Sequence, residues 1–352
     1  MAISTTTRGA VAVLAIAAVP VLASEDAEPT SMKTSWGVPD LQGTWDFRTM
    51  TPMNRPERFK DKEFLTEEEI AELEENTRKG HEAALAREAS DEPSQGDVDV
   101  GYDFIFIDVG TKVTGTRRTS LIVDPPNGRR PALTMFARMR QAENRAVWEK
   151  RPITAADRPP ATRCLVGFNS GPPMSSGAYN NMMRVVQSPG YVAILNEMVN
   201  DHRVIPTDGS EHVSDNVRLW KGDSRGRWEG DTLVVETRNF RPETSFSGSG
   251  PNMILTERFT RIDADALRYE YTVDDLESFE GKWSTVQDMR RTDDEIYEYA
   301  CHEGNRAMHL MLAGARKEER DGKPDAEGWL PSWYRGLPRK EDLLKESGEG
   351  EE

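Results

Sequence analysis

The chain has 352 residues, of which 30% are charged and 36% hydrophobic, and its formal net charge is −16 at pH 7. An acidic excess of this size disfavours nucleic acids and anionic membrane surfaces as partners. Part of the charge lies at the C-terminal end, where residues 337–352 are predicted to form an acidic, disordered tail.

The first 23 residues have the pattern of a secretory signal peptide. Arg8 is their only charged residue, an apolar run extends from Gly9 to Ala23, and Val21-Leu22-Ala23 supplies the small residues that a signal peptidase reads. The run is shorter than the roughly 20 residues that cross a bilayer as a helix, although an N-terminal anchor helix is the alternative. We therefore expect a periplasmic or secreted protein without a membrane span.

Cys164 and Cys301 are the two cysteines of the chain. An even pair in an oxidising compartment favours a disulfide between them. The alternative is two separate buried thiols, because free cysteines are often buried.

The mature chain is expected to start with a flexible lead-in, residues 24–35, followed by a single β-rich domain, residues 36–336. Gly43-Thr44-Trp45 marks the first strand. Thr66 and Glu69 have the spacing of a capping box, which predicts a surface helix near residues 67–89 inserted in the domain. Residues 91–101 form a polar linker.

Strand character begins at residues 102–110 and continues at residues 118–124, which are rich in aromatic and β-branched side chains. A helix is expected within residues 131–148. Residues 151–181 are rich in proline and glycine and lack a clear period. Loops of this length inside a compact domain are often functional.

The second half of the chain is a series of strands separated by short turns. The predicted strands are residues 183–187, 191–199, 202–206, 225–230, 231–240, 253–262, 266–273, 281–291 and 295–303, followed by a helix at 305–318. Strands at such spacing indicate a mainly β fold, either an antiparallel meander or a lipocalin-like barrel with a few peripheral helices.

Two resemblances accompany this pattern. The strings PDLQGTWDF, RTSLIVDPPNGR, SPGYVAILNE, WKGDSRGRWEGDTLVVETRNF and IYEYACHEGN are similar to a family of secreted bacterial proteins usually called hypothetical, and the similarity covers Trp36 to Arg316. Gly43-x-Trp45 resembles the first strand of lipocalins and their calycin relatives. The second resemblance implies a barrel that carries a lipophilic or aromatic molecule.

Alternation along the strands separates a polar face from an apolar face. Leu267, Tyr269, Tyr271 and Val273 share one face of their strand, whereas Glu270 lies on the other. Such polar faces point to solvent in most antiparallel sheets. The alternative is that they line a barrel, and in that case the ligand-binding candidates are Arg258, Glu270, Glu298 and His302.

Two histidines lie beside carboxylates at predicted strand ends. His302 precedes Glu303, and His202 follows Glu197 across a hairpin turn. These four residues are the catalytic candidates, because a histidine near a carboxylate suits acid–base chemistry near neutral pH. The alternative for the segment around His302 is a disulfide followed by a helix cap.

The long loop supplies further candidates. Tyr179, Asn180 and Asn181 carry a phenol and two amides, which suit a polar ligand or an oxyanion, although a turn-rich surface loop has the same composition. His212 is a third candidate histidine.

Several kinds of site are disfavoured. The chain has no His-x-His or His-Glu-x-x-His spacing, so no metal is expected. No dinucleotide fingerprint follows a predicted strand either.

These patterns predict an exported protein that binds a small molecule. The first hypothesis is a cofactor-free acid–base enzyme, a lyase, isomerase or hydrolase, acting on a small polar or aromatic substrate. Export favours chemistry that needs only protons and water. The alternative is a non-catalytic, lipocalin-like carrier of a lipophilic or aromatic ligand, and a structural or protein-binding role is a third option.

Overall fold

The computed structural model describes residues 32–85, 107–244, 246–324, 329–330 and 334–347. The predicted signal peptide and most of the lead-in lie outside this part of the chain. The strands are β1 (Gly43–Asp46), β2 (Ile122–Asp124), β3 (Met182–Ser188), β4 (Tyr191–Asn196), β5 (His202–Pro206), β6 (Asp223–Glu229), β7 (Thr232–Arg238), β8 (Ile254–Arg261), β9 (Ala266–Asp274) and β10 (Trp283–Thr292).

Helices are fewer than strands in the described residues. They are α1 (Glu67–Leu85), α3 (Met135–Trp148), α4 (Cys301–Gly304), α5 (Arg306–Arg320) and α6 (Lys340–Ser347), with short 3-10 turns at η1 (Glu57–Phe59), η3 (Ala155–Asp157) and η4 (Met198–Asn200). The predicted capping box is formed at α1, since Thr66 and Glu69 each accept a hydrogen bond from the backbone N–H of the other. No helix among the described residues has both the length and the apolar character needed to cross a membrane.

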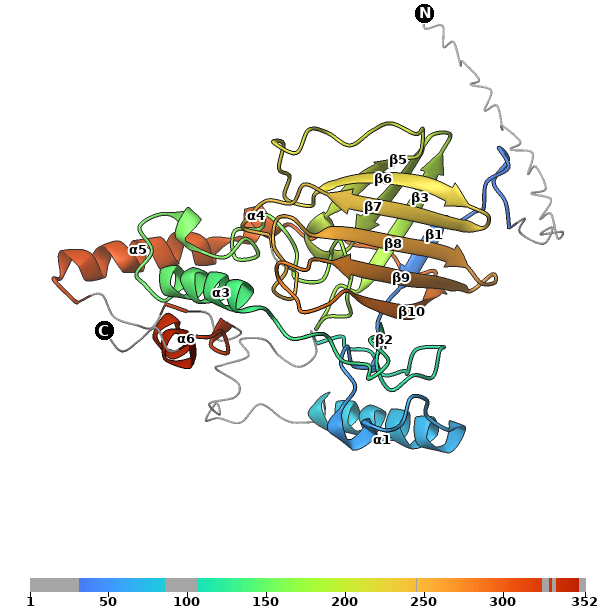
Figure 1. The fold of residues 1–352 in the computed structure, drawn as a ribbon, viewed down its shortest axis with the longest axis horizontal. Helices are drawn as coiled ribbons and strands as arrows, with labels where there is room; N and C mark the ends of the chain where they lie inside the picture. The colour runs from blue at the N-terminus through green and yellow to red at the C-terminus, as the bar shows by residue number, and fades with distance from the viewer. Residues whose placement is uncertain (1–31, 86–106, 245, 325–328, 331–333, 348–352) are drawn as a thin grey trace, which may run out of the picture. The chain divides into compact units, whose positions relative to one another are not determined.

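The strands form one antiparallel sheet in the order β5-β4-β3-β1-β10-β9-β8-β7-β6, with β2 paired to β10 (Figure 1). Consecutive hairpins build two meanders, β3 to β5 and β6 to β10, as the turn spacing predicted. β1 joins the two meanders, because Thr44 pairs with Arg184 of β3 on one side and with Thr292 of β10 on the other. The prediction of a mainly β, antiparallel meander is confirmed.

The sheet is not closed into a barrel in the described residues. The hydrogen-bonded ladder ends at β5 and β6, and β5 finishes at Pro206, which lacks the N–H that a closing ladder would use. The two end strands still touch, because a Cβ atom at Gly226 of β6 would lie 3.0 Å from Cγ2 of Ile205 in β5. The sheet is therefore strongly curved.

The inner face of the curved sheet holds the hydrophobic core. Leu267, Tyr269, Tyr271 and Val273 of β9 are all buried, and Trp45 and Trp283 are fully buried beside them. The predicted alternation along β9 is thus correct. Burying a large apolar side chain stabilises the fold by roughly 1.5–3 kcal/mol, so this face supplies most of the stability of the sheet.

One predicted strand is wrong, and a second is irregular in the part that the structure describes. Residues 293–300 have no strand structure, and α4 begins at Cys301 within the predicted strand 295–303. β10, which precedes this segment, already pairs with β1 and β9 and so offers no free edge to a further strand. Residues 107–110 of the predicted strand 102–110 are irregular, and its first five residues lie outside the described chain.

The predicted disordered tail, residues 337–352, is wrong in part. Residues 340–347 form α6, and Leu343 is buried. Arg138 of α3 makes two hydrogen bonds of 2.6 Å to the carboxylate of Glu346. An apolar contact and an ion pair to α3 thus hold a segment whose composition alone suggested disorder.

Candidate functional site

The proline- and glycine-rich loop before β3 packs against the core. Met174 in this loop is buried, and its backbone N–H donates a 3.1 Å hydrogen bond to the hydroxyl of Tyr269. Gly171 has a φ of +72°, and a Cβ atom there would lie 2.5 Å from the backbone carbon of Pro173. Only glycine fits this tight bend, which fixes the path of the loop.

A buried polar group lies beneath the loop. Arg203 of β5 makes hydrogen bonds of 2.5 and 2.7 Å to the carboxylate of Glu257 in β8, and Tyr269 donates a 2.7 Å bond to the same carboxylate. Burial alone would lower the pKa of Arg203, but the neighbouring Glu257 carboxylate raises it, so the pKa lies above its usual value. Burial and the neighbouring Glu257 raise the pKa of Tyr269 well above its usual range. Glu257 has no exposed surface, so this group braces the sheet.

A cavity of about 450 Å³ lies where the loop meets α3 and the segments 240–248 and 334–337. Its aromatic lining residues are Trp148, Phe168, Trp220, Phe240, Phe246 and Tyr334. We call this cavity the aromatic cleft. Its size and mixed lining are those of a small-molecule site, in which apolar surface provides affinity and a few polar groups provide orientation.

Aromatic contacts hold the cleft walls in place. Phe246 stacks on Trp283 of β10 with ring centroids 6.0 Å apart and meets Tyr271 of β9 edge-on at 5.9 Å. Trp148 at the end of α3 lies 4.7 Å from Tyr334, centroid to centroid. The cleft is thus continuous with the core aromatic cluster at one end of the sheet.

Three charged residues line the cleft, and two of them have ionic partners. Lys221 pairs with Asp201, and Glu243 pairs with Arg241 at 2.8 Å. Arg130 has no ionic partner among the described residues. Its guanidinium carbon instead lies 5.9 Å from the centroid of the Phe279 ring. Burial lowers the pKa of Arg130 below its usual value, and Tyr271 opposes this effect without cancelling it.

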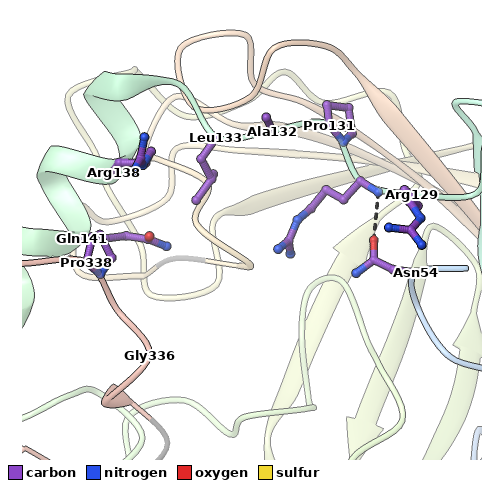
Figure 2. Close-up of a pocket in the computed structure, with 10 residues that line it drawn as sticks. Asn54, Arg129, Pro131, Ala132, Leu133, Arg138, Gln141, Gly336 and Pro338 are labelled. Carbon is purple, nitrogen blue, oxygen red and sulfur yellow. Dashed lines mark hydrogen bonds between the residues drawn. The ribbon is translucent and has the colours of Figure 1, made fainter. Parts of the chain in front are cut away.

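A second cavity of about 720 Å³ adjoins the first, because Arg130 and Gln141 line both. Figure 2 shows Asn54 and Arg129 on one side of it, and Arg138 and Gln141 of α3 on the other. Arg129 pairs with Glu57, and Arg138 with Glu346. Arg130 is again the cation without an ionic partner in the described chain.

The predicted catalytic pair at the β4–β5 hairpin does not line the aromatic cleft. His202 is exposed, and its backbone oxygen accepts a hydrogen bond from Lys221. Glu197 is buried, and the backbone N–H of Met182 donates a 3.3 Å bond to its carboxylate. Burial raises the pKa of Glu197, against a lowering hydrogen bond from Asn180.

The second predicted pair, His302 and Glu303, is exposed in α4. The predicted disulfide between Cys164 and Cys301 is formed, with Cα atoms 5.8 Å apart. It ties α4 to the loop whose residues Pro160, Ala161 and Val166 form part of the cleft wall. This segment therefore has the alternative role that the sequence allowed, a disulfide followed by a helix cap. Asn305 caps α5, because its side-chain oxygen accepts a hydrogen bond from the backbone N–H of Met308.

The three predicted strand-face ligands do not line the cleft either. Arg258 and Glu270 lie on the face of the sheet opposite the core, where the two are cross-strand partners. Arg258 also pairs with Glu229 at 3.0 Å. Glu298 is exposed in the irregular segment before α4. Alternation places both strand residues outside, because the other face carries the apolar core.

The loop candidates Tyr179 and Asn181 contact other residues of the loop, and the side chain of Asn180 hydrogen-bonds Glu197. Asn181 is buried. Its side-chain amide accepts a 2.6 Å hydrogen bond from the N–H of Gly177 and donates a 3.0 Å bond to the carbonyl oxygen of Gly177. The rings of Tyr179 and Phe168 meet edge-on at 5.3 Å.

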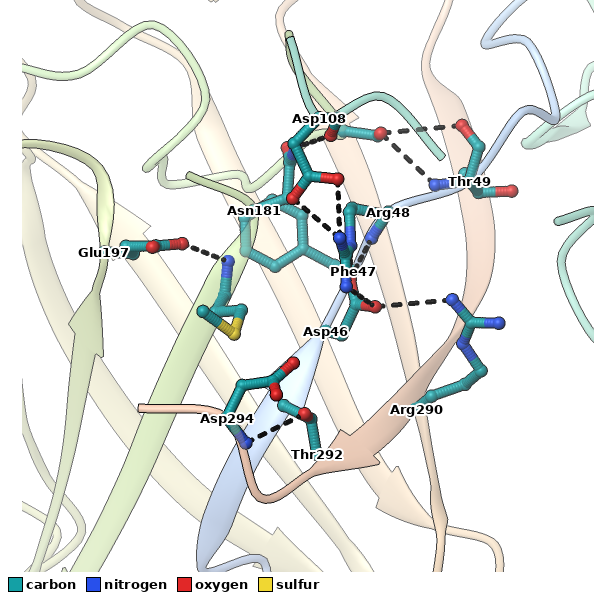
Figure 3. A network of polar contacts seen from close by, with 12 residues as sticks. Asp46, Phe47, Arg48, Thr49, Asp108, Asn181, Glu197, Arg290, Thr292 and Asp294 are labelled. Atoms are coloured by element: carbon teal, nitrogen blue, oxygen red, sulfur yellow. Dashed lines mark hydrogen bonds and ion pairs between the residues drawn. The ribbon is translucent and has the colours of Figure 1, made fainter. Parts of the chain in front are cut away.

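Asn181 also belongs to a polar network around Arg48, which bridges Asp46 and Asp108 (Figure 3). The side chain of Asn181 donates to the backbone oxygen of Asp108 at 3.1 Å. The bond to Asp46 is the main reason that the pKa of Arg48 is raised. This network fastens the long loop and residue 108 to the end of β1.

His212 is held by two carboxylates, with Nδ1 2.9 Å from Asp223 and Nε2 3.3 Å from Glu236. The group fastens the loop before β6 to the strands. No cluster of three or more histidine, cysteine or acidic side chains suited to a metal occurs in the described ranges.

No local sequence pattern identifies the residues of the aromatic cleft, although proline and glycine content marks the long loop that forms one wall. Trp220, Phe246 and Arg130 come from segments far apart in the chain, and no local spacing connects them. Comparison of the sequence with models of known protein families and with curated proteins finds no match.

Proposed function

We propose that this chain is a small-molecule-binding protein whose ligand occupies the aromatic cleft. The supporting observation is the cavity of about 450 Å³ lined by six aromatic side chains at the end of the curved sheet. An apolar pocket with a few polar groups, held by a rigid sheet, is the usual form of a ligand site.

The carrier hypothesis fits this geometry better than the enzyme hypothesis. None of His202, His302, Glu197 and Glu303 lines the cleft. A lipocalin-like carrier needs a largely apolar cavity without a free acid–base pair, and the Lys221 and Glu243 side chains that line the cleft are held in ion pairs. We therefore place a lipophilic or aromatic ligand against Phe246 and Trp220.

We also propose that the protein is exported after removal of residues 1–23. The disulfide between Cys164 and Cys301 supports this, because such bonds persist in oxidising compartments. N-terminal sequencing of the protein from its native host tests the proposal: a chain that begins with Ser24 supports it, and a retained Met1 contradicts it.

A cavity-filling substitution tests the ligand site. Ala161 lines the cleft and is half-buried, so Ala161→Trp is expected to fill it. Ala264, exposed in the β8–β9 turn, provides the matched control Ala264→Trp. Binding is measured with N-phenyl-1-naphthylamine, a neutral aromatic probe that fluoresces in apolar surroundings. Saturable binding that is lost in Ala161→Trp and kept in Ala264→Trp supports the proposal. Binding that is kept in both variants, or no binding by the native protein, overturns it.

Acid–base catalysis by Glu197 and His202 is a second candidate, favoured by one observation. Glu197 is a buried carboxyl group whose pKa is raised by burial, as is common for a catalytic acid. The test is a screen for lyase, isomerase and hydrolase activity with His202→Ala and His302→Ala beside the native protein. If a substrate turns over and both variants keep the full rate, these histidines are not catalytic.

A further inference from the structure

Three polar side chains that line the aromatic cleft have no side-chain hydrogen bond to the rest of the described chain. Gln141 and Asn144 lie one turn apart on α3, and both line the cleft with Arg130. Neither amide forms a hydrogen bond within the described residues, and neither does the guanidinium of Arg130. Three unused donors thus face one cavity whose other charged residues are already paired.

A half-buried cation without a partner is costly, because burial removes water from its charge. Proteins normally place a carboxylate beside such a group, as this chain does for Lys221 and Arg203. At Arg130 the described chain provides the Phe279 ring instead, at 5.9 Å. A bound anion would supply the missing charge.

We infer that the ligand of the aromatic cleft is an organic anion with an aromatic body, and that Arg130 binds its acidic group. Arg130 determines the specificity for charge, with Gln141 and Asn144 as further hydrogen-bond donors. The aromatic body contacts Phe246 and Trp220. This inference rests on the proposed function, because it needs the cleft to be the ligand site.

Because Arg130 is half-buried, its guanidinium would attract a bound anion more strongly than it would in bulk water. A guanidinium binds a carboxylate or sulfonate through two parallel hydrogen bonds, and each charged bond contributes more in surroundings with little water. Burial lowers the pKa of Arg130, and an anion beside it would reverse this effect. The cation remains protonated throughout the working range of pH.

Two fluorescent probes that differ by one charge test the inference. N-phenyl-1-naphthylamine is neutral, and 8-anilinonaphthalene-1-sulfonate has the same aromatic skeleton with an anionic group. In Arg130→Gln the affinity for the sulfonate is expected to fall by at least about tenfold, because a charged hydrogen bond to the probe is lost. Affinity for the neutral probe should change by less than about threefold.

The neighbouring arginine provides the control. Arg129 pairs with Glu57 at the surface, so Arg129→Gln should leave the affinity for both probes unchanged. A selective loss in Arg130→Gln alone supports the inference. An equal effect on both probes, or none, overturns it while the aromatic cleft remains the proposed site. If the native protein binds neither probe, the proposed function itself fails.

A second measurement does not depend on the folding of a variant. In the native protein, 2-naphthoate is expected to displace the bound sulfonate probe at least about tenfold more strongly than the neutral 2-naphthalenemethanol. Equal displacement by the acid and the alcohol overturns the inference.

Discussion

Arg203 and Glu257 meet across the apolar inner face of the curved sheet, with their side chains joined by two hydrogen bonds of 2.5 and 2.7 Å. They come from β5 and β8, which are not neighbours in the sheet. The pair therefore depends on the curvature that brings the two meanders face to face. The hydroxyl of Tyr269 connects the same carboxylate to the backbone of Met174 in the cleft loop.

Removing one member of this pair should be more harmful than removing both. Glu257→Leu leaves the Arg203 charge buried without a partner, and we expect a loss of about 3–5 kcal/mol in the free energy of unfolding. The double variant Arg203→Met/Glu257→Leu should recover much of that loss. Urea denaturation of the single and double variants measures the coupling.

The residue next to Glu257 in β8 provides a control. Arg258 is on the outer face and pairs with the half-exposed Glu229, so Arg258→Met should cost under about 1 kcal/mol. A loss in Arg258→Met equal to that in Glu257→Leu would contradict our account of the two faces.

Glu197 should make stability depend on pH. Because burial raises its pKa in the folded state, the folded carboxylate carries a penalty that is fully present above the folded pKa. The penalty disappears as the pH falls below the unfolded pKa, near 4.5. Glu197→Gln is thus expected to raise the Tm at about pH 7.5 and to have little effect at about pH 3.5. A Tm gain that is the same at both values would show that the gain is not due to ionisation.

The disulfide between Cys164 and Cys301 closes a loop with a sequence separation of 137 residues. For a loop of this length the chain-entropy model gives up to about 5 kcal/mol of stabilisation. The double variant Cys164→Ala/Cys301→Ala should therefore unfold at lower urea concentration. Alkylation without reductant followed by intact-mass analysis checks the bond itself, and two alkylated thiols in the purified protein would contradict it.

Gly171 should be necessary for the cleft loop. Gly171→Ala places a Cβ atom 2.5 Å from backbone, at a residue whose φ is +72°. We expect a loss of more than about 1 kcal/mol and weaker binding of aromatic probes. Gly190 has a φ of +83° and open space around it, so Gly190→Ala isolates the effect of φ alone. Equal losses in the two variants would show that the contact with Pro173 is unimportant.

Local sequence patterns were enough to predict the hairpins of β3 to β10, the capping box at Thr66 and the helix that became α5. Each of these depends on residues within a few positions of one another, where turn formers, alternation and capping side chains act directly. The disulfide was predicted from the count of cysteines and the expected compartment. The same local reading failed at residues 295–303, because the availability of a free sheet edge is not a local property.

The proposed ligand site depended on the tertiary structure. Arg130, Trp220 and Phe246 line one cavity only because the segments before α3, before β6 and after β7 meet at one end of the sheet. Glu257 has the same setting in the sequence as any polar residue of a strand, and the curvature of the sheet decides that it faces Arg203 rather than water. Contacts between distant segments depend on how the whole chain packs, and the sequence alone does not show which polar side chains that packing will bury together.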